Sequence, residues 1–359
     1  MSLRFVGKIR VSILQRSAPA LLVSFLALAA SPLQAQVTLP PISVGAGLQT
    51  SFVHNDFKNN AGSSSDRFFV DHARLYVNGS VTSQIKFMFN TDYDSSSNKV
   101  GVLDAAARIE VKPQFNIWMG RFLPPSDRAN LHGPFYAHNW AVYSDGIQNG
   151  HPAVYQGRDN GIVWWGDFAE RVKISVGAFD GPSLGTGSPK ILTAARVQID
   201  FWDKESGYYL NGNYYGDKNL LAIAGSTQTQ SGNMASTVDF LLEKKLPGGG
   251  VVSVESEYAS YNRLGGYVAG FKSQGAYGLA SFLFPKQVGV GKFEILGKYA
   301  KAEFTHGPTP SYQQKTTEID FNYVIKQHNA RVMSFFKDTR FNNKNPDTWQ
   351  GGVGLQIQM

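Results

Sequence analysis

The chain ends in the stretch WQGGVGLQIQM, residues 349–359, in which apolar and polar side chains alternate. The apolar positions Trp349, Val353, Leu355, Ile357 and Met359 fall on one face, and the other face carries only glutamine and glycine. Successive side chains of a β-strand point to opposite faces. This stretch therefore predicts a strand with one apolar and one polar side.

Segments of the same kind recur from about residue 43 to the end, with turn residues between them. Strands are predicted at 43–55, 67–80, 84–94, 101–111, 115–122, 160–167, 171–180, 190–202, 206–215, 219–228, 235–245, 250–261, 274–284, 291–304, 315–326, 329–341 and 349–359. Many such strands favour an all-β fold, a transmembrane antiparallel β-barrel with lipid outside and water inside. Since bacterial single-chain barrels have an even number of strands, one of these 17 segments must be wrongly assigned.

The first 35 residues are typical of a secretory signal that is cleaved after Ala35. Arg4, Lys8, Arg10 and Arg16 precede an apolar run over 18–30. The alternative is a membrane anchor, but this run is short of the roughly 20 residues needed to span a bilayer. The expected domains are a signal peptide, 1–35, and a single barrel domain, 36–359.

Composition limits the function classes. Removing the four basic residues of the signal lowers the formal net charge from +7 to +3, which gives no nucleic-acid signature. The chain has no cysteine, so it forms no disulfides. Aromatic residues make up 13%, and membrane barrels use them as girdles at both interfaces.

The longest connection lies at 123–159. A loop of this length inside a compact domain is usually functional or disordered, and its aromatic content argues against disorder. We expect it to fold into the lumen and narrow it, with an extracellular cap as the alternative. Its candidate constriction aromatics are Phe135, Tyr136, Trp140 and Tyr143.

Four motifs in order resemble the family of phosphate-selective porins O and P. They are DHARLYV at 71–77, MGRF at 119–122 with the following prolines, GRDNGI at 157–162 and AARVQ at 194–198. The resemblance implies a 16-stranded barrel, with 18 strands as the alternative. It also implies a homotrimer, a third outer loop folded into the channel, and basic residues that attract anions.

Two features depart from that family. Its constriction uses lysines, whereas residues 123–156 contain no lysine, so phosphate selectivity is left open. Such barrels also commonly end in an aromatic residue, whereas this chain ends in Met359.

Strand alternation assigns side chains to the lumen or the lipid. In 67–80, Phe69 and Leu75 are expected outside, and in 101–111 Leu103 is expected outside. The predicted lumen-lining basic residues are Arg74, Lys86, Arg108, Arg121, Arg128, Arg158, Lys173 and Arg196. The predicted acidic ones are Asp104, Glu110, Asp127, Asp145, Asp200, Glu255, Glu257, Glu318 and Asp320. The predicted basic residues cluster early in the chain and many of the acidic ones late in it. In a closed barrel this order predicts walls of opposite charge that face each other across the water. The alternative is that each charge pairs with a neighbouring one.

The sequence thus predicts a bacterial outer-membrane porin for passive diffusion of small hydrophilic solutes, with a mild anion preference and phosphate as one candidate. Its expected partners are solutes or anions, outer-membrane lipid and two further copies, without nucleic acid, cofactor or metal. No catalytic motif supports the alternative of a barrel lipase or protease. A second alternative, an adhesin or receptor, needs a plug or very long outer loops. The transported solute and the trimer interface are not specified by the sequence.

Overall fold

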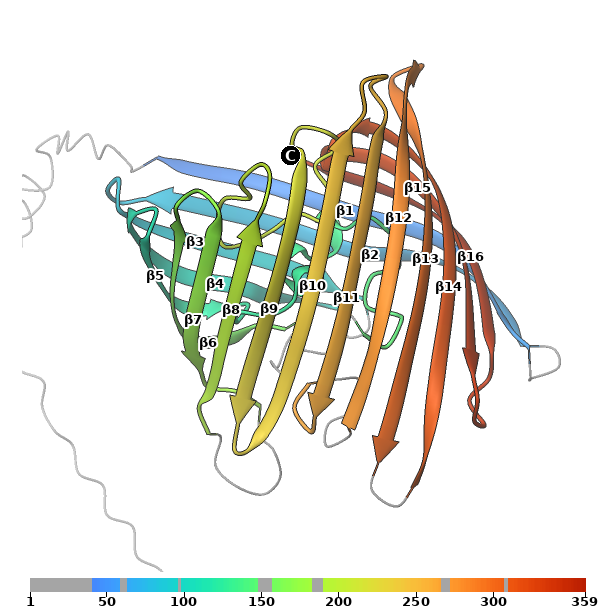
Figure 1. Ribbon diagram of the computed structural model, residues 1–359. Coiled ribbons are helices and arrows are strands. Elements are labelled where there is room, and N and C mark those ends of the chain that lie inside the picture. Colours follow the sequence, from blue (N-terminus) through green and yellow to red (C-terminus); the bar gives the residue numbers. More distant parts are fainter. Residues whose placement is uncertain are drawn as a thin grey trace, which may run out of the picture. The chain divides into compact units, whose positions relative to one another are not determined.

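A computed structural model describes residues 41–58, 63–95, 98–147, 157–182, 190–265, 272–306 and 309–359 (Figure 1). The predicted signal peptide, 1–35, lies outside these residues, as do residues 148–156 of the long connection. Among the described residues, no helix is long and apolar enough to cross a bilayer.

The described chain forms one closed antiparallel barrel of 16 strands in sequence order. The strands are β1 (Ile42–Phe57), β2 (Ser64–Ser80), β3 (Ile85–Asp94), β4 (Lys99–Lys112), β5 (Phe115–Phe122), β6 (Asp159–Phe168), β7 (Val172–Phe179), β8 (Leu192–Asp200), β9 (Leu220–Gln230), β10 (Asn233–Lys245), β11 (Val251–Asn262), β12 (Lys272–Val288), β13 (Gly291–His306), β14 (Thr309–Lys326), β15 (Ala330–Phe341) and β16 (Thr348–Gln358). The prediction of 16 strands is confirmed.

Closure depends on the alternating stretch at the end of the chain. β16 pairs with β1 along its length, with Ile357 opposite Leu48. The N–H of Met359 donates to the carbonyl of Ala46, and the N–H of Ala46 donates to the carbonyl of Met359, both at 2.9 Å. Because a closed barrel pairs every strand edge, its backbone hydrogen bonds are satisfied within a membrane.

Burial follows the predicted alternation. In β8 the inward Arg196, Gln198 and Asp200 are buried in the barrel interior, whereas Val197 and Ile199 are exposed on the outside. An exposed apolar outer surface with a polar interior is the reverse of a water-soluble sandwich and suits a lipid environment.

Two outward assignments were wrong, both at β-bulges. The register between β1 and β2 shifts after Gln49, which leaves Asp71 as an extra residue. Phe68 and Val70 are therefore exposed, and Phe69 lines an internal cavity. A second shift, between β3 and β4, leaves Leu103 as the extra residue, and its side chain is buried. An extra residue reverses the face of every side chain beyond it.

The false strand is 206–215. Residues 201–219 connect β8 to β9 without regular structure, and Gly207, Tyr215 and Gly216 have positive φ. The backbone of this segment bonds to another loop: the N–H of Leu210 donates to Leu131 and that of Gly212 to Tyr136, at 3.3 and 2.8 Å. Its tyrosines, at 208, 209, 214 and 215, give it the composition of a strand, but the segment packs inside the barrel instead of crossing the membrane.

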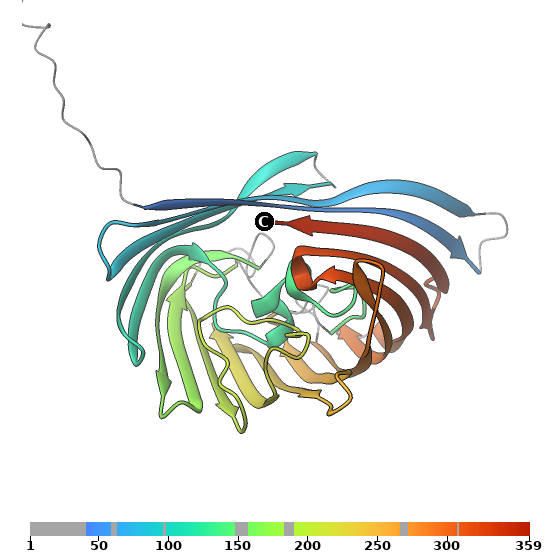
Figure 2. The ribbon, with the colours of Figure 1, turned by 90° about the horizontal axis from the view of Figure 1, so that it is seen from above.

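Connections divide between two rims because neighbouring strands are antiparallel. We call the rim reached after odd-numbered strands the loop rim, and the other the turn rim. The turn-rim connections are at most five residues long, apart from 201–219. The connection between β5 and β6 is the third on the loop rim, and it folds into the lumen as predicted (Figure 2). It contains helix α2 (Arg128–His132) and the 3-10 turn η1 (Pro134–Tyr136); a second such turn, η2 (Gln327–Asn329), joins β14 to β15.

Candidate functional site

Helix α2 begins and ends on local signals. Asp127 is the N-cap, and its carboxylate accepts a 2.9 Å hydrogen bond from the Asn130 N–H. Gly133 follows the last residue, with a φ of 64° that favours glycine. These signals form a short helix inside the barrel, between the two prolines that open the loop and Pro134.

Arg128 attaches this helix to the opposite connection. Its two terminal nitrogens donate to the two oxygens of Glu205 at 2.8 and 2.6 Å, and one also donates to the Asn211 carbonyl at 2.9 Å. Both side chains are fully buried. Burial opposes ionisation of Glu205, but the Arg128 guanidinium outweighs this effect and lowers the pKa of this carboxyl. The pair therefore stays charged and bidentate.

We call the connection between β5 and β6, residues 123–158, the constriction loop. Beyond helix α2, it binds the part of the barrel wall formed by strands β11 to β14. His138 contacts Glu255 at 3.2 Å, and the Asn139 amide donates to Glu318 at 3.2 Å. Lys298 pairs with Asp145 at 2.7 Å. The loop therefore lies against strands β11 to β14 through charged and polar contacts.

This arrangement changes the meaning of the predicted acidic wall. Eight of the nine predicted acidic residues are buried, with at most 3% exposure: Asp104, Asp127, Asp145, Asp200, Glu255, Glu257, Glu318 and Asp320. Those on the late strands do point inward, but the loop and the 201–219 segment cover them. The predicted acidic wall therefore does not face open water, because the constriction loop lies between this wall and the lumen.

Three predicted basic residues are covered in the same way. Arg128, Lys173 and Arg196 are buried, and Arg196 donates to Asp239 at 2.9 Å. Arg121 requires a different correction. It shares a face of β5 with Met119, which is exposed on the outside of the barrel, and its Nε donates to the Val102 carbonyl at 3.2 Å. The glycine between them, Gly120, has a φ of 135°.

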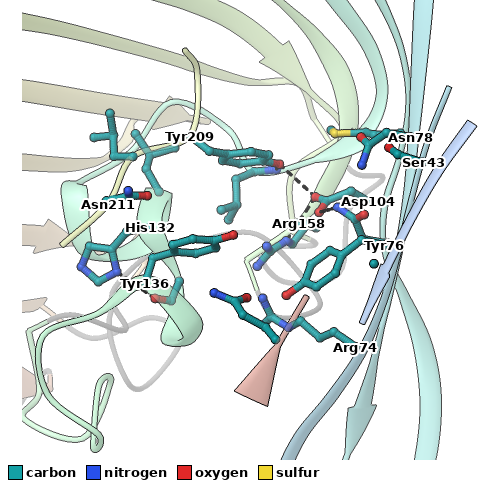
Figure 3. A pocket seen from close by; sticks show the side chains of 18 of the residues that line it. Ser43, Arg74, Tyr76, Asn78, Asp104, His132, Tyr136, Arg158, Tyr209 and Asn211 are labelled. Atoms are coloured by element: carbon teal, nitrogen blue, oxygen red, sulfur yellow. Dashed lines mark hydrogen bonds and ion pairs between the residues drawn. The ribbon is translucent and has the colours of Figure 1, made fainter. Parts of the chain in front are cut away.

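The open space lies along the early strands. A cavity of about 580 Å³, which we call the arginine cavity, is lined by Arg74, Arg108 and Arg158 together with Asp104. Figure 3 shows Arg74, Arg158 and Asp104 in this cavity. The Arg158 Nε lies 3.4 Å from an Asp104 oxygen. The same oxygen accepts a 2.9 Å hydrogen bond from the Tyr209 hydroxyl. Three guanidinium groups and one carboxylate thus line this cavity.

A second cavity of about 370 Å³ lies toward the loop rim, and we call it the loop-rim cavity. Asp71, His72, Trp140 and Lys337 are among its lining residues. His72 lines the loop-rim cavity and Arg74 the arginine cavity. Both side chains contact the buried carboxylate of Asp92 on β3, which accepts hydrogen bonds from them at 2.7 and 3.0 Å.

The four candidate aromatics have different positions. Tyr136 lines the arginine cavity and Trp140 the loop-rim cavity. Phe135 is fully buried beneath the guanidinium of Arg74, whose carbon lies 5.0 Å from the ring centre. The Tyr143 hydroxyl donates to the Ala129 carbonyl at 3.1 Å, and burial raises the pKa of Tyr143. Phe135 and Tyr143 therefore hold the loop in place.

Lys86 and Glu110 lie closer to the turn rim, 2.7 Å apart, and Arg108 lies 3.8 Å from Glu110. Glu110 and Arg108 also line a third cavity of about 530 Å³ beside Trp118 and Tyr208. These charges are partly exposed and paired with neighbours.

Alternation in 84–94 predicts that Asp92 points into the lumen, and its side chain is buried inside the barrel. Sequence reasoning missed Glu205, Asp239 and Tyr209, although Asp239 alternates inward like the residues that were selected. In the sequence, Glu205 lies in a short segment that predicts a tight turn, and Tyr209 lies in the false strand. Short and long connections alternate along the predicted barrel except around 203–235, and this exception was the signal that the strand assignment there was wrong.

No protein-family model matches the sequence, and a search of curated protein sequences found no match. Solved structures are similar in fold. Salmonella typhi OmpF in complex with daunomycin matches with a TM-score of 0.61 at 10% identity, over 89% of this chain and 98% of that one. The fold is that of porin-like outer-membrane barrels.

Two further porin-like channels match over 89% of this chain. OprB of Pseudomonas putida has a TM-score of 0.59 at 8% identity over 94% of its own length. The outer-membrane channel DcaP of Acinetobacter baumannii has a TM-score of 0.56 at 12% identity over 97% of its length. These likenesses concern the porin barrel in general and do not single out the phosphate-selective family that the motifs resemble.

Proposed function

We propose that the chain is a porin of the bacterial outer membrane, a water-filled channel for passive diffusion of small hydrophilic solutes. The observation that carries this proposal is the pair of polar cavities along one wall of a closed barrel whose outer surface is apolar. Water-filled lumens with charged walls are the usual interior of such barrels. The mature chain would begin near Gln36, after cleavage of the signal.

The lining favours anions mildly. Three arginines and one aspartate line the arginine cavity, so the local field is positive. Each of the three guanidinium groups nevertheless has a carboxylate near it. These carboxylates are Asp92 for Arg74, Glu110 for Arg108 and Asp104 for Arg158. Partial neutralisation weakens the preference. Because guanidinium groups bind oxyanions in a bidentate way, phosphate and small carboxylates are the candidate solutes.

Transport of this kind needs no catalytic residue, and we propose none. A homotrimer is proposed from the resemblance to the phosphate-selective porins. Comparing unheated and heated samples on a gel tests it, because a detergent-stable trimer migrates slowly until it is heated. Migration of the unheated protein as a monomer would refute the trimer.

Planar bilayers containing the purified protein test the channel itself. We expect stepwise conductance, and a reversal potential in a KCl gradient whose sign shows a modest excess of chloride over potassium permeability. Absence of steps from folded protein would exclude the porin function. A strongly cation-selective reversal potential would exclude the proposed role of the arginine cavity.

A further inference from the structure

One connection on the turn rim differs from all the others there. The connection 201–219 between β8 and β9 is several times longer than its neighbours on that rim, which have two to five residues. A plain hairpin would serve the barrel equally well. The backbone hydrogen bonds between β8 and β9 continue beyond the ends of these strands. The Phe201 N–H donates to the Leu221 carbonyl at 2.8 Å, and the Asp203 N–H donates to the Asn219 carbonyl at 2.9 Å. The remaining residues, 204–218, are thus additional to closure.

We propose that this segment forms the second face of the constriction, so that the passage is narrowed by one connection from each rim. The proposal rests on the porin function proposed above and adds specificity-determining residues to it. Tyr209 and Asn211 are the residues assigned to this face, since both line the arginine cavity opposite the arginines of the early strands (Figure 3).

The segment is bound tightly to the constriction loop. The Tyr208 hydroxyl donates to the Leu123 carbonyl at 2.7 Å, beside the backbone bonds from Leu210 and Gly212 described above. The buried Arg128–Glu205 pair joins the same two connections. Breaking a buried ion pair by removing one partner is costly, so these two connections behave as one body.

The segment also reaches the opposite wall. Tyr209 donates to Asp104 on β4, and its ring lies 5.8 Å from that of Trp118 on β5. The segment therefore extends across the lumen from β8 and β9 to β4 and β5. The Tyr209 hydroxyl donates to the same Asp104 oxygen that lies beside the Arg158 guanidinium, which links the segment to the charged groups of the passage.

The segment is anchored at its other end as well. The backbone N–H groups of Tyr214 and Gly216 donate to the carboxylate of Glu243 on β10, at 2.7 and 2.6 Å. His328 in η2 contacts the Asn213 carbonyl at 2.9 Å. With anchors on three sides, Tyr209 and Asn211 are held in the passage.

A cysteine-free chain allows a direct test. In the variant Asn211→Cys, modification with a negatively charged methanethiosulfonate reagent should reduce the chloride current and shift the reversal potential toward cations, and the positively charged reagent should shift it toward anions. The control is Gly248→Cys, in an exposed turn on the same rim with open space around it. It should react without changing the current.

A second variant replaces residues 204–218 by Asn-Gly and keeps the hairpin bonds of Phe201 and Asp203. We expect a larger conductance and a weaker ion preference. Unchanged currents in both variants, with the wild type conducting, would overturn the second face alone. A wild type that folds and does not conduct would overturn the porin function, and this inference with it. If Asn211→Cys fails to fold, the replacement variant decides.

Discussion

Arg128 illustrates how a single residue organises the interior of this barrel. It binds Glu205 through two hydrogen bonds and lies 3.7 Å from Asp239, all without contact with water. Sequence alternation can identify inward side chains such as Arg196, but it cannot say which of them a loop will cover. Arg74 and Arg196 look equivalent in the sequence. One lines a cavity and the other lies buried against Asp239 because the loop packs on only one wall.

The Arg128–Glu205 pair gives the first prediction. Glu205→Gln should destabilise the folded barrel by about 3 kcal/mol, because it leaves a buried guanidinium without its main partner. Thermal unfolding in detergent, followed by circular dichroism, measures the change. The control is Glu170→Gln, which removes an 83% exposed glutamate from an ion pair with Lys204 and should change stability by less than about 0.5 kcal/mol. Equal losses in the two variants would contradict the structural role of the pair.

Asp127 gives a pH dependence. Burial raises its pKa to about 6, and the charge of Asp239 adds to this effect. The folded state therefore binds this proton more tightly than the unfolded chain does, and the contribution of Asp127 to stability falls as pH rises from about 4 through 6.

Asp127→Asn should consequently flatten the fall in thermal stability between pH 5 and pH 7.5, by about 1.4 kcal/mol. Parallel melts of both proteins at the two pH values measure this. Glu205 does not interfere, because its lowered pKa leaves it ionised throughout that range. An identical pH dependence of the two proteins would show that Asp127 is not the titrating group.

Among the elements of the fold, the two-residue alternation of apolar side chains and the turn residues between the segments predicted all 16 strands, with small errors at their ends. The one false strand shows the limit of this pattern. Residues 206–215 alternate as a strand does, but their partners are the carbonyls of Leu123, Leu131 and Tyr136, which the sequence does not place nearby. The β-bulges at Asp71 and Leu103 were also beyond the pattern, because alternation alone does not mark an extra residue.

The constriction loop gives the third prediction. Replacing residues 138–147 by a short Gly-Ser linker should raise single-channel conductance and reduce the anion preference. The deletion removes the contacts of His138 and Asn139 and exposes Glu255 and Glu318 to the lumen water. Bilayer recordings of conductance and reversal potential measure both effects. A deletion of 183–189, in the next loop-rim connection, is the control; equal effects from the two deletions would contradict the assignment.

In the whole molecule, the strand that closes the barrel also contacts the constriction loop inside it. β16 pairs with β1 and β15, and its Gly354 leaves space for the ring of Trp140, which lies 2.5 Å from where a Cβ would be. The wall and the loop are thus fitted to each other. We expect Gly354→Val to displace the loop, and to lower the thermal stability by about 1–3 kcal/mol. Gly297→Val, where a Cβ meets open space, is the control; equal stability of both variants would contradict this fit.

We propose that solutes pass along the wall lined by Arg74 of β2, Arg108 of β4 and Arg158, which directly precedes β6. The most direct measurement is the reversal potential in a KCl gradient of a variant that changes Arg74, Arg108 and Arg158 to Gln. Its control changes the exposed Lys112, Lys245 and Lys301 to Gln, so that both lose three positive charges. We predict that the arginine variant shifts toward potassium selectivity while the control keeps the wild-type value. The same reversal potential in the arginine variant and the wild type would contradict the account.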